Sequence, residues 1–476
     1  MTRRRGAFFA ALGAGALQAS TARAFEGQVR AETAAQAWQV RGPSGAPVLS
    51  LRRLTQTLSL GAWQRPEDPR GAVWTVRARL RIDSDFGGAC DASGERCLGE
   101  LERSRTADFA PLFARRAVDL PFAYIDAQGL LRRAVDLRVG RQFVVDPLGF
   151  FVFDGARVQL HLGARARVEL YGGLETRTGF PLSSGRFERD GLQRADRAGW
   201  DPTLAPNVQD RAQAGAAGLA VTLTPTRALH ARATWRRVWT RDGTAEEKLG
   251  GSVELQTGAY SLVTAEAVYS VPHNTVGNLS VGLEYAPPER ASWGVELSRF
   301  RPTFDATSLW ASFWTDPTDD LRGRLELPLG ARWTLVASAL ARRYALGETA
   351  PDRGVPADRD AFAGGGGLGL LHRRSRAEGS LRARAETGGA GSRGGLDLTA
   401  SWWARPGRIR LDGGASLWAV EDALRDTRMV SVAVLVGAMV RLGRVAEVSF
   451  NLEEDTNPVV GARLRATGIL RLLGPF

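Results

Sequence analysis

The chain has 476 residues, and 63 Lys and Arg against 51 Asp and Glu give it a formal charge of +12 at neutral pH. Its longest apolar run, residues 430–440, is about half of the ~20 residues that a membrane-spanning helix needs, so the composition excludes a helical membrane protein. Lys248 is the only lysine, which indicates a genome rich in G and C more than selection for a guanidinium at each site. The placement of the arginines is therefore more informative than their number.

The N-terminal segment has the three parts of a secretory signal peptide. Arginines at positions 3–5 are followed by a short apolar stretch, residues 6–19, and then by Ala22-Arg23-Ala24, the small-x-small pattern of a leader-peptidase site. We therefore expect residues 1–24 to be removed and the mature chain to begin at Phe25. Removal takes away four arginines and no acid, so the formal charge of the mature chain is 12 − 4 = +8.

From about residue 49 onward, apolar and polar residues alternate with period two. In residues 72–83, for example, Trp74 and Val76 alternate with Arg77 and Arg79, and in a strand these two sets lie on opposite faces. The same alternation recurs in residues 229–236, 278–285, 321–327, 381–386 and 446–453. A soluble β-sandwich would also alternate, but many positions on the apolar face here are only Ala or Gly, which argues against an ordinary core.

The connections between these segments alternate between short and long. Short turns fall at residues 126–129, 224–227, 286–291, 328–331, 404–408 and 441–444, and longer polar loops at 84–116, 177–212, 241–247, 301–319 and 345–360. Short periplasmic turns and long extracellular loops are typical of outer-membrane β-barrels, whose strands number about 20, or any even count of about 18–22 for a chain of this size. We therefore predict an all-β fold, a single transmembrane antiparallel β-barrel over residues 25–476, in the outer membrane of a Gram-negative-type cell.

Two local features fit secretion to that membrane. Cys90 and Cys97 lie in one predicted long loop, and in an oxidising compartment we expect a disulfide between them. The last segment alternates up to the terminal Phe476, which resembles the signal read by the barrel-assembly machinery, although Pro475 departs from the usual ending. The expected partners are therefore this machinery and outer-membrane lipid.

With the apolar face toward lipid, the charged residues of the other face line the lumen. The predicted pore-lining arginines are Arg77, Arg79, Arg81, Arg138, Arg232, Arg236, Arg322, Arg324, Arg382, Arg384, Arg463 and Arg465. Because the last strand closes against the first, Arg463 and Arg465 are expected to share a basic arc with residues 77–81. Four successive segments supply the predicted acidic sector: Glu254, Glu266, Glu284 and Glu296. Basic rings favour anions, whereas cross-strand ion pairs would only hydrate the wall, and the sequence leaves both interpretations open.

No arrangement of residues indicates catalysis. The four histidines are assigned to turns, a loop and a strand end: His161, His230, His273 and His372. No serine or acid visibly converges with them, and a lone histidine at a turn is more often solvated surface than a general base. We therefore expect no enzymatic activity, no metal, no cofactor and no nucleic-acid partner.

One hairpin resembles a known family. Residues 137–142 (LRVGRQ), followed by residues 153–158 (FDGARV), resemble the R-x-GRQ…DG hairpins of alginate-export and related porin-like barrels. The resemblance implies a passive conduit for an anionic polysaccharide that works with periplasmic export components, and it carries over no site residue. One alternative is a diffusion porin for small anionic or neutral solutes, favoured if a long loop such as 84–116 or 177–212 folds inward. The other is a structural or adhesive barrel whose loops bind an external partner.

Overall fold

The computed structural model describes residues 25–41, 47–64, 71–85, 117–176, 214–240, 243–301, 317–345, 361–388, 391–422, 427–457 and 461–475. The predicted signal peptide, the Cys90–Cys97 pair and Phe476 lie outside these residues. A four-residue helical turn, α2 (Leu130–Arg133), joins β4 to β5. In the part of the chain that the structure describes, no helix is long and apolar enough to cross a membrane.

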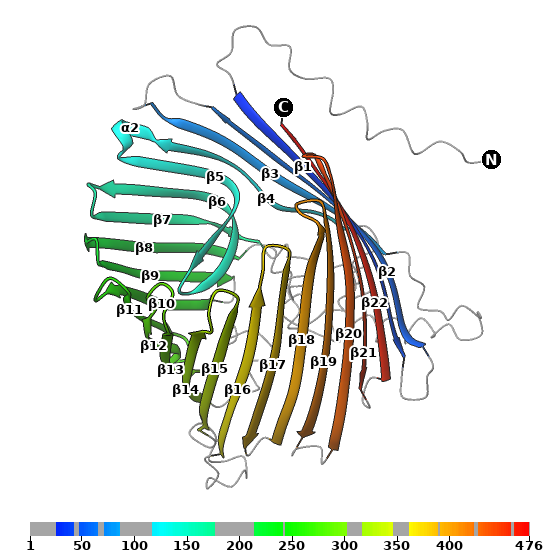
Figure 1. Cartoon of the computed structure of the whole chain (residues 1–476). Helices are drawn as coiled ribbons and strands as arrows, with labels where there is room; N and C mark the ends of the chain where they lie inside the picture. The colour runs from blue at the N-terminus through cyan, green and yellow to red at the C-terminus, as the bar shows by residue number, and fades with distance from the viewer. Residues whose placement is uncertain are drawn as a thin grey trace, which may run out of the picture.

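The described residues form twenty-two strands (Figure 1). Their bounds are β1 (Phe25–Arg41), β2 (Pro47–Gln64), β3 (Val73–Asp85), β4 (Ala117–Gly129), β5 (Val135–Asp146), β6 (Gly149–Leu162), β7 (Ala166–Glu175), β8 (Gly215–Thr226), β9 (Leu229–Thr240), β10 (Gly243–Gln256), β11 (Ser261–Ser270), β12 (Thr275–Tyr285), β13 (Ser292–Phe300), β14 (Thr318–Pro328), β15 (Trp333–Tyr344), β16 (Ala361–Arg373), β17 (Ala377–Gly388), β18 (Gly391–Arg405), β19 (Ile409–Asp422), β20 (Thr427–Leu442), β21 (Ala446–Asn457) and β22 (Gly461–Pro475). The count is the upper end of the predicted range, and the prediction of an all-β antiparallel barrel is confirmed.

The sheet is closed. Each strand pairs antiparallel with its neighbours in sequence, and β1 pairs both with β2 and with β22. The closing register runs from Gln28 opposite Pro475 to Arg41 opposite Ala462. Closure leaves no row of unpaired backbone groups at a sheet edge, which is the condition for placing a sheet in hydrocarbon.

The predicted short turns and long loops lie at opposite ends of the barrel, but the turn predicted at residues 126–129 lies within β4, and α2 makes that connection instead. Residues 443–445 join β20 to β21, whereas residues 86–116 and 176–214 separate β3 from β4 and β7 from β8 at the opposite end of the barrel. The predicted loop 241–247 is wrong over most of its length, because β10 already begins at Gly243, opposite Thr240 of β9. The polar residues that suggested a loop there include Glu246, whose carboxylate is held by an arginine of β9 on the inner face.

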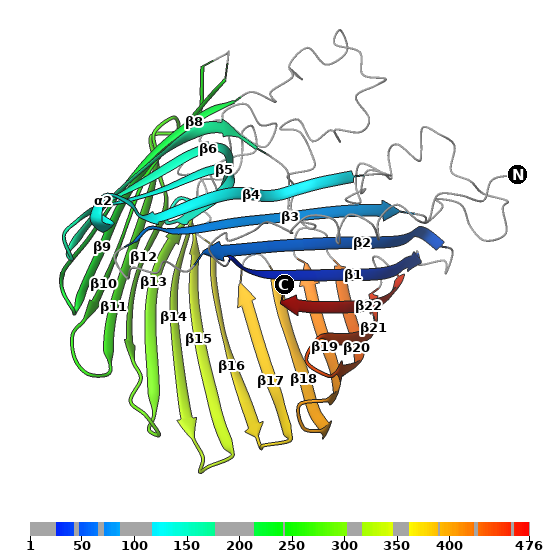
Figure 2. The ribbon, with the colours of Figure 1, turned by 90° about the horizontal axis from the view of Figure 1, so that it is seen from above.

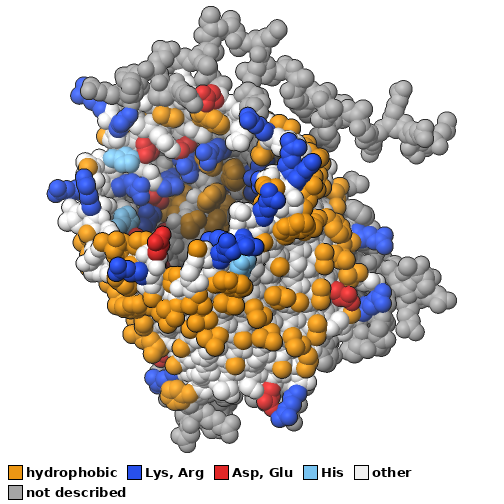
Figure 3. All heavy atoms as spheres, viewed as in Figure 1, with side chains coloured by type: hydrophobic (Ala, Val, Ile, Leu, Met, Phe, Trp, Pro, Cys, Tyr) orange, Lys and Arg blue, Asp and Glu red, His pale blue; other side chains and the backbone are white. Residues whose placement is uncertain are grey.

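The outer surface of the wall is apolar and exposed. Side chains at alternate positions point away from the barrel, and even large ones are open, such as Phe450, which is 51% exposed. Figure 3 shows these side chains as a broad hydrophobic surface below a mouth edged with charged residues. Trp74, Trp239 and Trp293 lie on this surface near strand ends, as aromatic girdles at the membrane interfaces do. A closed antiparallel barrel with this outer surface is an outer-membrane, porin-like β-barrel.

Candidate functional site

The candidate site is the inner wall, and most of its predicted arginines face acids. The seven arginines with an ion pair, each given with its acid, are Arg138–Asp126, Arg232–Glu169, Arg236–Glu246, Arg322–Asp320, Arg324–Glu326, Arg463–Asp455 and Arg465–Glu453. Arg81 is buried. The remaining four, Arg77, Arg79, Arg382 and Arg384, have no ion pair with any described residue. Five of these pairs join different strands and two lie within β14, so the wall is largely a lattice of ion pairs with a smaller set of guanidinium groups that have no acid partner in the described chain.

The expected basic arc is less basic than the sequence suggests. The strands lie as predicted, since β22, β1, β2 and β3 are consecutive in the wall. Arg465, however, lies directly opposite Glu453 on β21, and the Arg463 guanidinium contacts both Glu453 and Asp455. The positive charge of this arc is therefore concentrated on Arg77 and Arg79 of β3.

The four predicted acidic residues also differ in whether they have an interaction partner. Glu296 lies 3.7 Å from the Arg322 guanidinium, and Glu266 accepts a hydrogen bond from Asn278 at 3.0 Å. Glu254 and Glu284 have no ion pair within the described chain. Among the sixteen predicted charged positions of the lumen, four arginines and three acids (Glu254, Glu266 and Glu284) thus have no ion pair with a described residue.

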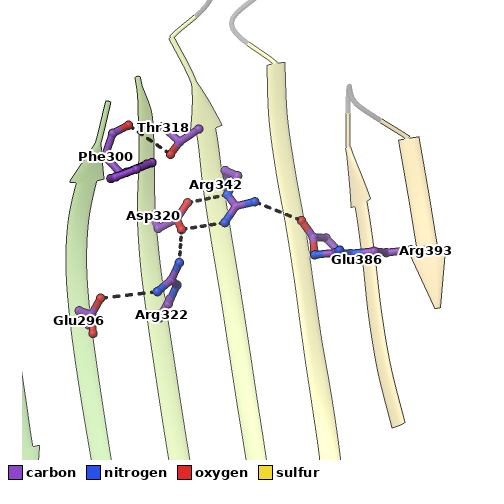
Figure 4. Close-up of polar contacts among 8 residues, drawn as sticks. All are labelled: Glu296, Phe300, Thr318, Asp320, Arg322, Arg342, Glu386 and Arg393. Atoms are coloured by element: carbon purple, nitrogen blue, oxygen red, sulfur yellow. Dashed lines mark hydrogen bonds and ion pairs between the residues drawn. The ribbon is translucent and has the colours of Figure 1, made fainter. Parts of the chain in front are cut away.

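A ladder of alternating charges crosses the wall from β13 to β18 (Figure 4). Its centre is Asp320 on β14, a buried carboxylate that accepts two hydrogen bonds from Arg342, at 2.7 and 2.9 Å, and one from Arg322 at 2.6 Å. Each of these guanidinium groups also approaches a second acid, Arg322 approaching Glu296 at 3.7 Å and Arg342 approaching Glu386 at 3.8 Å. Bidentate geometry of this kind fixes the direction of the side chains as well as their distance.

The far end of the ladder is built over a strand of small residues. Arg342 approaches Glu386 of β17 at 3.8 Å, and Glu386 accepts hydrogen bonds from Arg393 of β18 at 2.5 and 3.0 Å. Between β15 and β17, the inner face of β16 carries Gly365 and Gly367. A Cβ at Gly367 would lie 3.1 Å from Cγ of Arg384, so the glycine lets the arginine stem lie against the wall. Gly365, Arg384, Glu386 and Arg393 border a cavity that is also lined by Glu284, Arg324 and Trp418.

A second feature of the lumen is the inner hairpin, residues 142–153, formed by the ends of β5 and β6. Pairing of β5 to β4 stops at Arg141 opposite Ala123, and pairing of β6 to β7 stops at Phe153 opposite Glu175. Beyond these points the two strands pair only with each other, apart from one hydrogen bond of 3.0 Å that the Thr176 N–H donates to the carbonyl of Val152. Figures 1 and 2 show this hairpin (cyan) leaving the wall and curling inward.

The bend is made by the motif that carries the family resemblance. Gly140 has φ +124°, and a Cβ there would lie 2.3 Å from the carbonyl oxygen of Ala123, so only glycine fits. Arg141 binds Asp154 through two hydrogen bonds of 2.7 Å. The fully buried Gln142 donates to the carbonyl of Gly155 at 3.0 Å. The GRQ and DG residues thus fix the point at which the hairpin turns into the lumen.

One side of the inner hairpin packs on the inner face of β7 to β10. Its core contains Phe153, which is 0% exposed, stacked on Tyr171 at a centroid distance of 5.1 Å, together with Phe151 and Val238. Burying aromatic side chains in this way is the main stabilising contribution to such a contact. The hairpin therefore rests on the wall and occupies part of the lumen.

The other side of the inner hairpin faces the open lumen. Val145 is 67% exposed there, and Phe150 is half-exposed. Phe143 lies 5.5 Å from Phe150 and 6.1 Å from Phe122 of β4, both measured between ring centroids. Phe122 itself stands opposite Arg79 on the neighbouring strand. The narrowed section thus has aromatic rings beside one of the unpaired arginines.

The inner hairpin was not predicted, although the sequence contains a signal for it. Residues 143–145 and 150–153 are uninterrupted apolar runs, in contrast to the alternation of the wall strands. An uninterrupted apolar run of this length indicates a segment that does not have one face toward lipid and the other toward water. The loops expected to narrow the pore are residues 84–116, described only at 84–85, and 177–212, outside the described residues.

The histidines have local contacts. His161 lies 2.8 Å from Asp136, His230 lies 3.4 Å from Thr224, and the His372 ring lies 4.4 Å from that of Trp333. Among the described residues, no group of three or more His, Cys, Asp or Glu side chains could hold a metal ion.

Comparison with known proteins gives structural likenesses at low sequence identity. No family model matches the chain, and no curated protein matches it. OccAB4 of Acinetobacter baumannii is 9% identical with a TM-score of 0.46, covering 95% of this chain and 98% of that one. A BenF-like porin from Pseudomonas fluorescens Pf-5 is 9% identical with a TM-score of 0.46, covering 95% and 99%. Pseudomonas aeruginosa OpdK, solved with vanillate, is 10% identical with a TM-score of 0.42, covering 94% and 99%.

Proposed function

We propose that this barrel is a passive diffusion channel for small solutes, with a preference for anions. The observation that carries the proposal is a lumen narrowed by the inner hairpin and lined by four arginines without an acid partner among the described residues. A barrel of this size is too wide for wall side chains alone to fill its lumen. An element folded inside is therefore what limits the size of a solute.

The charge balance supports the preference for anions. Of the sixteen predicted lumen charges, four arginines (Arg77, Arg79, Arg382 and Arg384) and three acids (Glu254, Glu266 and Glu284) have no ion pair with a described residue, and no acid stands opposite Arg77 or Arg79 on either neighbouring strand. Paired charges contribute little field at a distance, because each guanidinium is cancelled by its carboxylate. Unpaired arginines lower the electrostatic cost of bringing an anion into the pore.

The same geometry favours small solutes over a polysaccharide. The GRQ and DG residues, which suggested an export channel, here form the bend of a hairpin that occupies the lumen. That role requires no sugar polymer, and the expectation of polysaccharide export gains no support from it. The proposal includes no catalytic step.

The test is single-channel recording of the refolded protein in a planar bilayer. We compare the wild type with a variant in which Arg77, Arg79, Arg382 and Arg384 are changed to Gln. The expected result is an anion-selective current in the wild type and loss of that selectivity in the variant. Polyethylene glycols of increasing size, added to the bath, measure the width of the narrowest section.

The matched control also removes four charges, but these are the two positive and two negative charges of two ion pairs. It carries Arg463→Gln with Asp455→Asn, and Arg465→Gln with Glu453→Gln, and is expected to keep the wild-type selectivity because the net charge is unchanged. A wild-type protein that carries no current would overturn the channel proposal and favour a structural barrel. A current whose selectivity is the same in all three proteins would overturn the role given to the unpaired arginines.

A further inference from the structure

The inner hairpin is attached to the wall at two places. At its base the backbone can bend, and at its tip a side-chain contact can be released. The attachment at the base is the row formed by Gly140, Gly155 and Gly173 on three adjacent strands. A Cβ at Gly155 would lie 2.0 Å from the carbonyl oxygen of Gly172, so the backbones approach closely there without side chains between them. Small residues at the base of a projecting element are where a change in backbone angles costs least.

The releasable attachment is at the tip. Arg236 of β9, only 3% exposed, donates a hydrogen bond of 3.0 Å to the carbonyl of Leu148 in the hairpin turn. The same guanidinium is held by Glu246 at 2.9 Å and lies 4.7 Å from the centroid of the Phe151 ring. A single wall residue thus contacts both the backbone and a side chain of the inner hairpin.

The wall beneath the inner hairpin contains polar side chains as well as apolar ones. Glu169, which is 1% exposed, interacts with Arg157 at 2.7 Å and with Arg232 at 3.7 Å. Its Oε1, the atom that faces Arg232, is buried without a hydrogen bond to any described residue, and so is the Oδ2 of Asp146 on the hairpin itself. Burying polar atoms in this way costs free energy that is recovered when they meet water. The apolar core of Phe151 and Phe153 therefore stabilises the docked position, and the polar atoms beneath it oppose docking.

From these opposing contributions we propose that the inner hairpin is a gate. The hairpin rotates about the row of Gly140, Gly155 and Gly173. In the docked position Arg236 holds its tip and the pore is narrow, and in the undocked position the lumen is wider. The proposal rests on the channel function proposed above. It adds that the pore has two conductance levels, whose relative occupancy is set by the contact between Arg236 and the hairpin tip.

The latch is tested by Arg236→Gln, recorded beside Arg322→Gln as a matched control whose acid partners lie on another part of the wall. The wild type is expected to show brief steps to a larger conductance. Arg236→Gln is expected to raise the ratio of large to small conductance by about tenfold, because a hydrogen bond to a charged group is lost. Arg322→Gln is expected to leave this ratio unchanged. Equal ratios in all three proteins would overturn the latch.

A tether tests the movement itself. A Cβ at Gly250 of β10 would lie 2.5 Å from Cδ2 of Leu148, so cysteines at these two positions are close enough to bridge with a small adjustment. The variant carries Leu148→Cys and Gly250→Cys, with Cys90→Ser and Cys97→Ser. Oxidation is expected to abolish the larger conductance and reduction to restore it. Steps that persist after verified crosslinking would overturn the gate, whereas the absence of any current in the wild type would instead overturn the channel function.

Hydrogen exchange on the unmodified protein serves if the tethered variant does not fold. The amides of residues 143–152 are expected to exchange faster than those of residues 168–174 on β7, which the hairpin covers. Equal protection of the two segments would mean that the hairpin is rigid, and the gate would be rejected.

Discussion

The strands of the regular wall, β12 to β22, and those of the inner hairpin, from β5 and β6, lie in different surroundings. In the wall, one face meets lipid and the other meets water, so apolar and polar residues alternate, as in residues 446–453 of β21. In the hairpin both faces leave the lipid, and one of them packs on protein. Its residues 150–153 are therefore all apolar. The two regions differ in what each face of a strand contacts, and the order of apolar and polar residues follows from those contacts.

The largest expected effect comes from removing the hairpin and keeping the wall. Residues 143–152 are replaced by Asn-Gly, which closes Gln142 to its cross-strand partner Phe153 with a two-residue turn. We expect a several-fold rise in single-channel conductance and a larger polymer exclusion size, with the barrel still folded. Unchanged conductance in a correctly folded variant would show that the narrowest section lies elsewhere.

Phe153→Ala should weaken docking without opening the barrel. Truncating a fully buried Phe costs about 3–5 kcal/mol, and here the cost falls on the contact between hairpin and wall. The expected result is faster hydrogen exchange in residues 143–152 and more time at high conductance. Phe450→Ala on the lipid-facing side is the control and is expected to change neither, so an equal response of the two variants would contradict the assignment of their faces.

Charge substitutions in the middle of β20 test which face meets lipid. Val434 is half-exposed on the outer surface, and Leu435 is the next residue along the strand, on the inner face. Val434→Arg is expected to lower the free energy of unfolding by about 2–4 kcal/mol, the cost of an arginine at the bilayer midplane. Leu435→Arg should cost much less because it meets water. Urea unfolding in lipid vesicles measures both, and equal losses would contradict a transmembrane wall.

The smallest effect is expected from one exposed ion pair of the ladder. Arg393 is more than half exposed, so its contact with Glu386 is screened by water. Arg393→Gln should change the free energy of unfolding by about 0–1 kcal/mol. A loss well above that range, in the same unfolding assay, would indicate that the ladder acts as one cooperative unit from Asp320 outward.

The wall could be predicted from the sequence because its rule is local. Alternation identifies each strand by itself, and the closed order then follows from joining neighbours. The first strand was faint in the sequence because small and polar residues occupy most of β1, as in Thr33-Ala34-Ala35-Gln36-Ala37, yet it pairs along its full length with β2. Here the partner strands, and not the local pattern, define the element.

The ion pairs and the inner hairpin could not be predicted in the same way. Whether Arg463 is paired or free depends on the register of β21, which places Asp455 opposite it, and a register is fixed by two strands together. The hairpin depends on contacts between Leu148 and Arg236, which are 88 residues apart. Its bend could have been suspected from Gly140 and Gly155, but the direction of the bend is a tertiary property.

The pairing of β1 with β22 has a consequence for how the chain is made. Gln28 pairs with Pro475. β1 is therefore synthesised long before β22, the strand that completes its backbone hydrogen bonds. Until then it presents an open edge, which is a template for wrong pairing with other chains. Contacts this distant in sequence also form slowly. The chain therefore depends on being kept apart from its own copies until synthesis is finished, and its maturation should be limited by ring closure and not by the formation of any single hairpin.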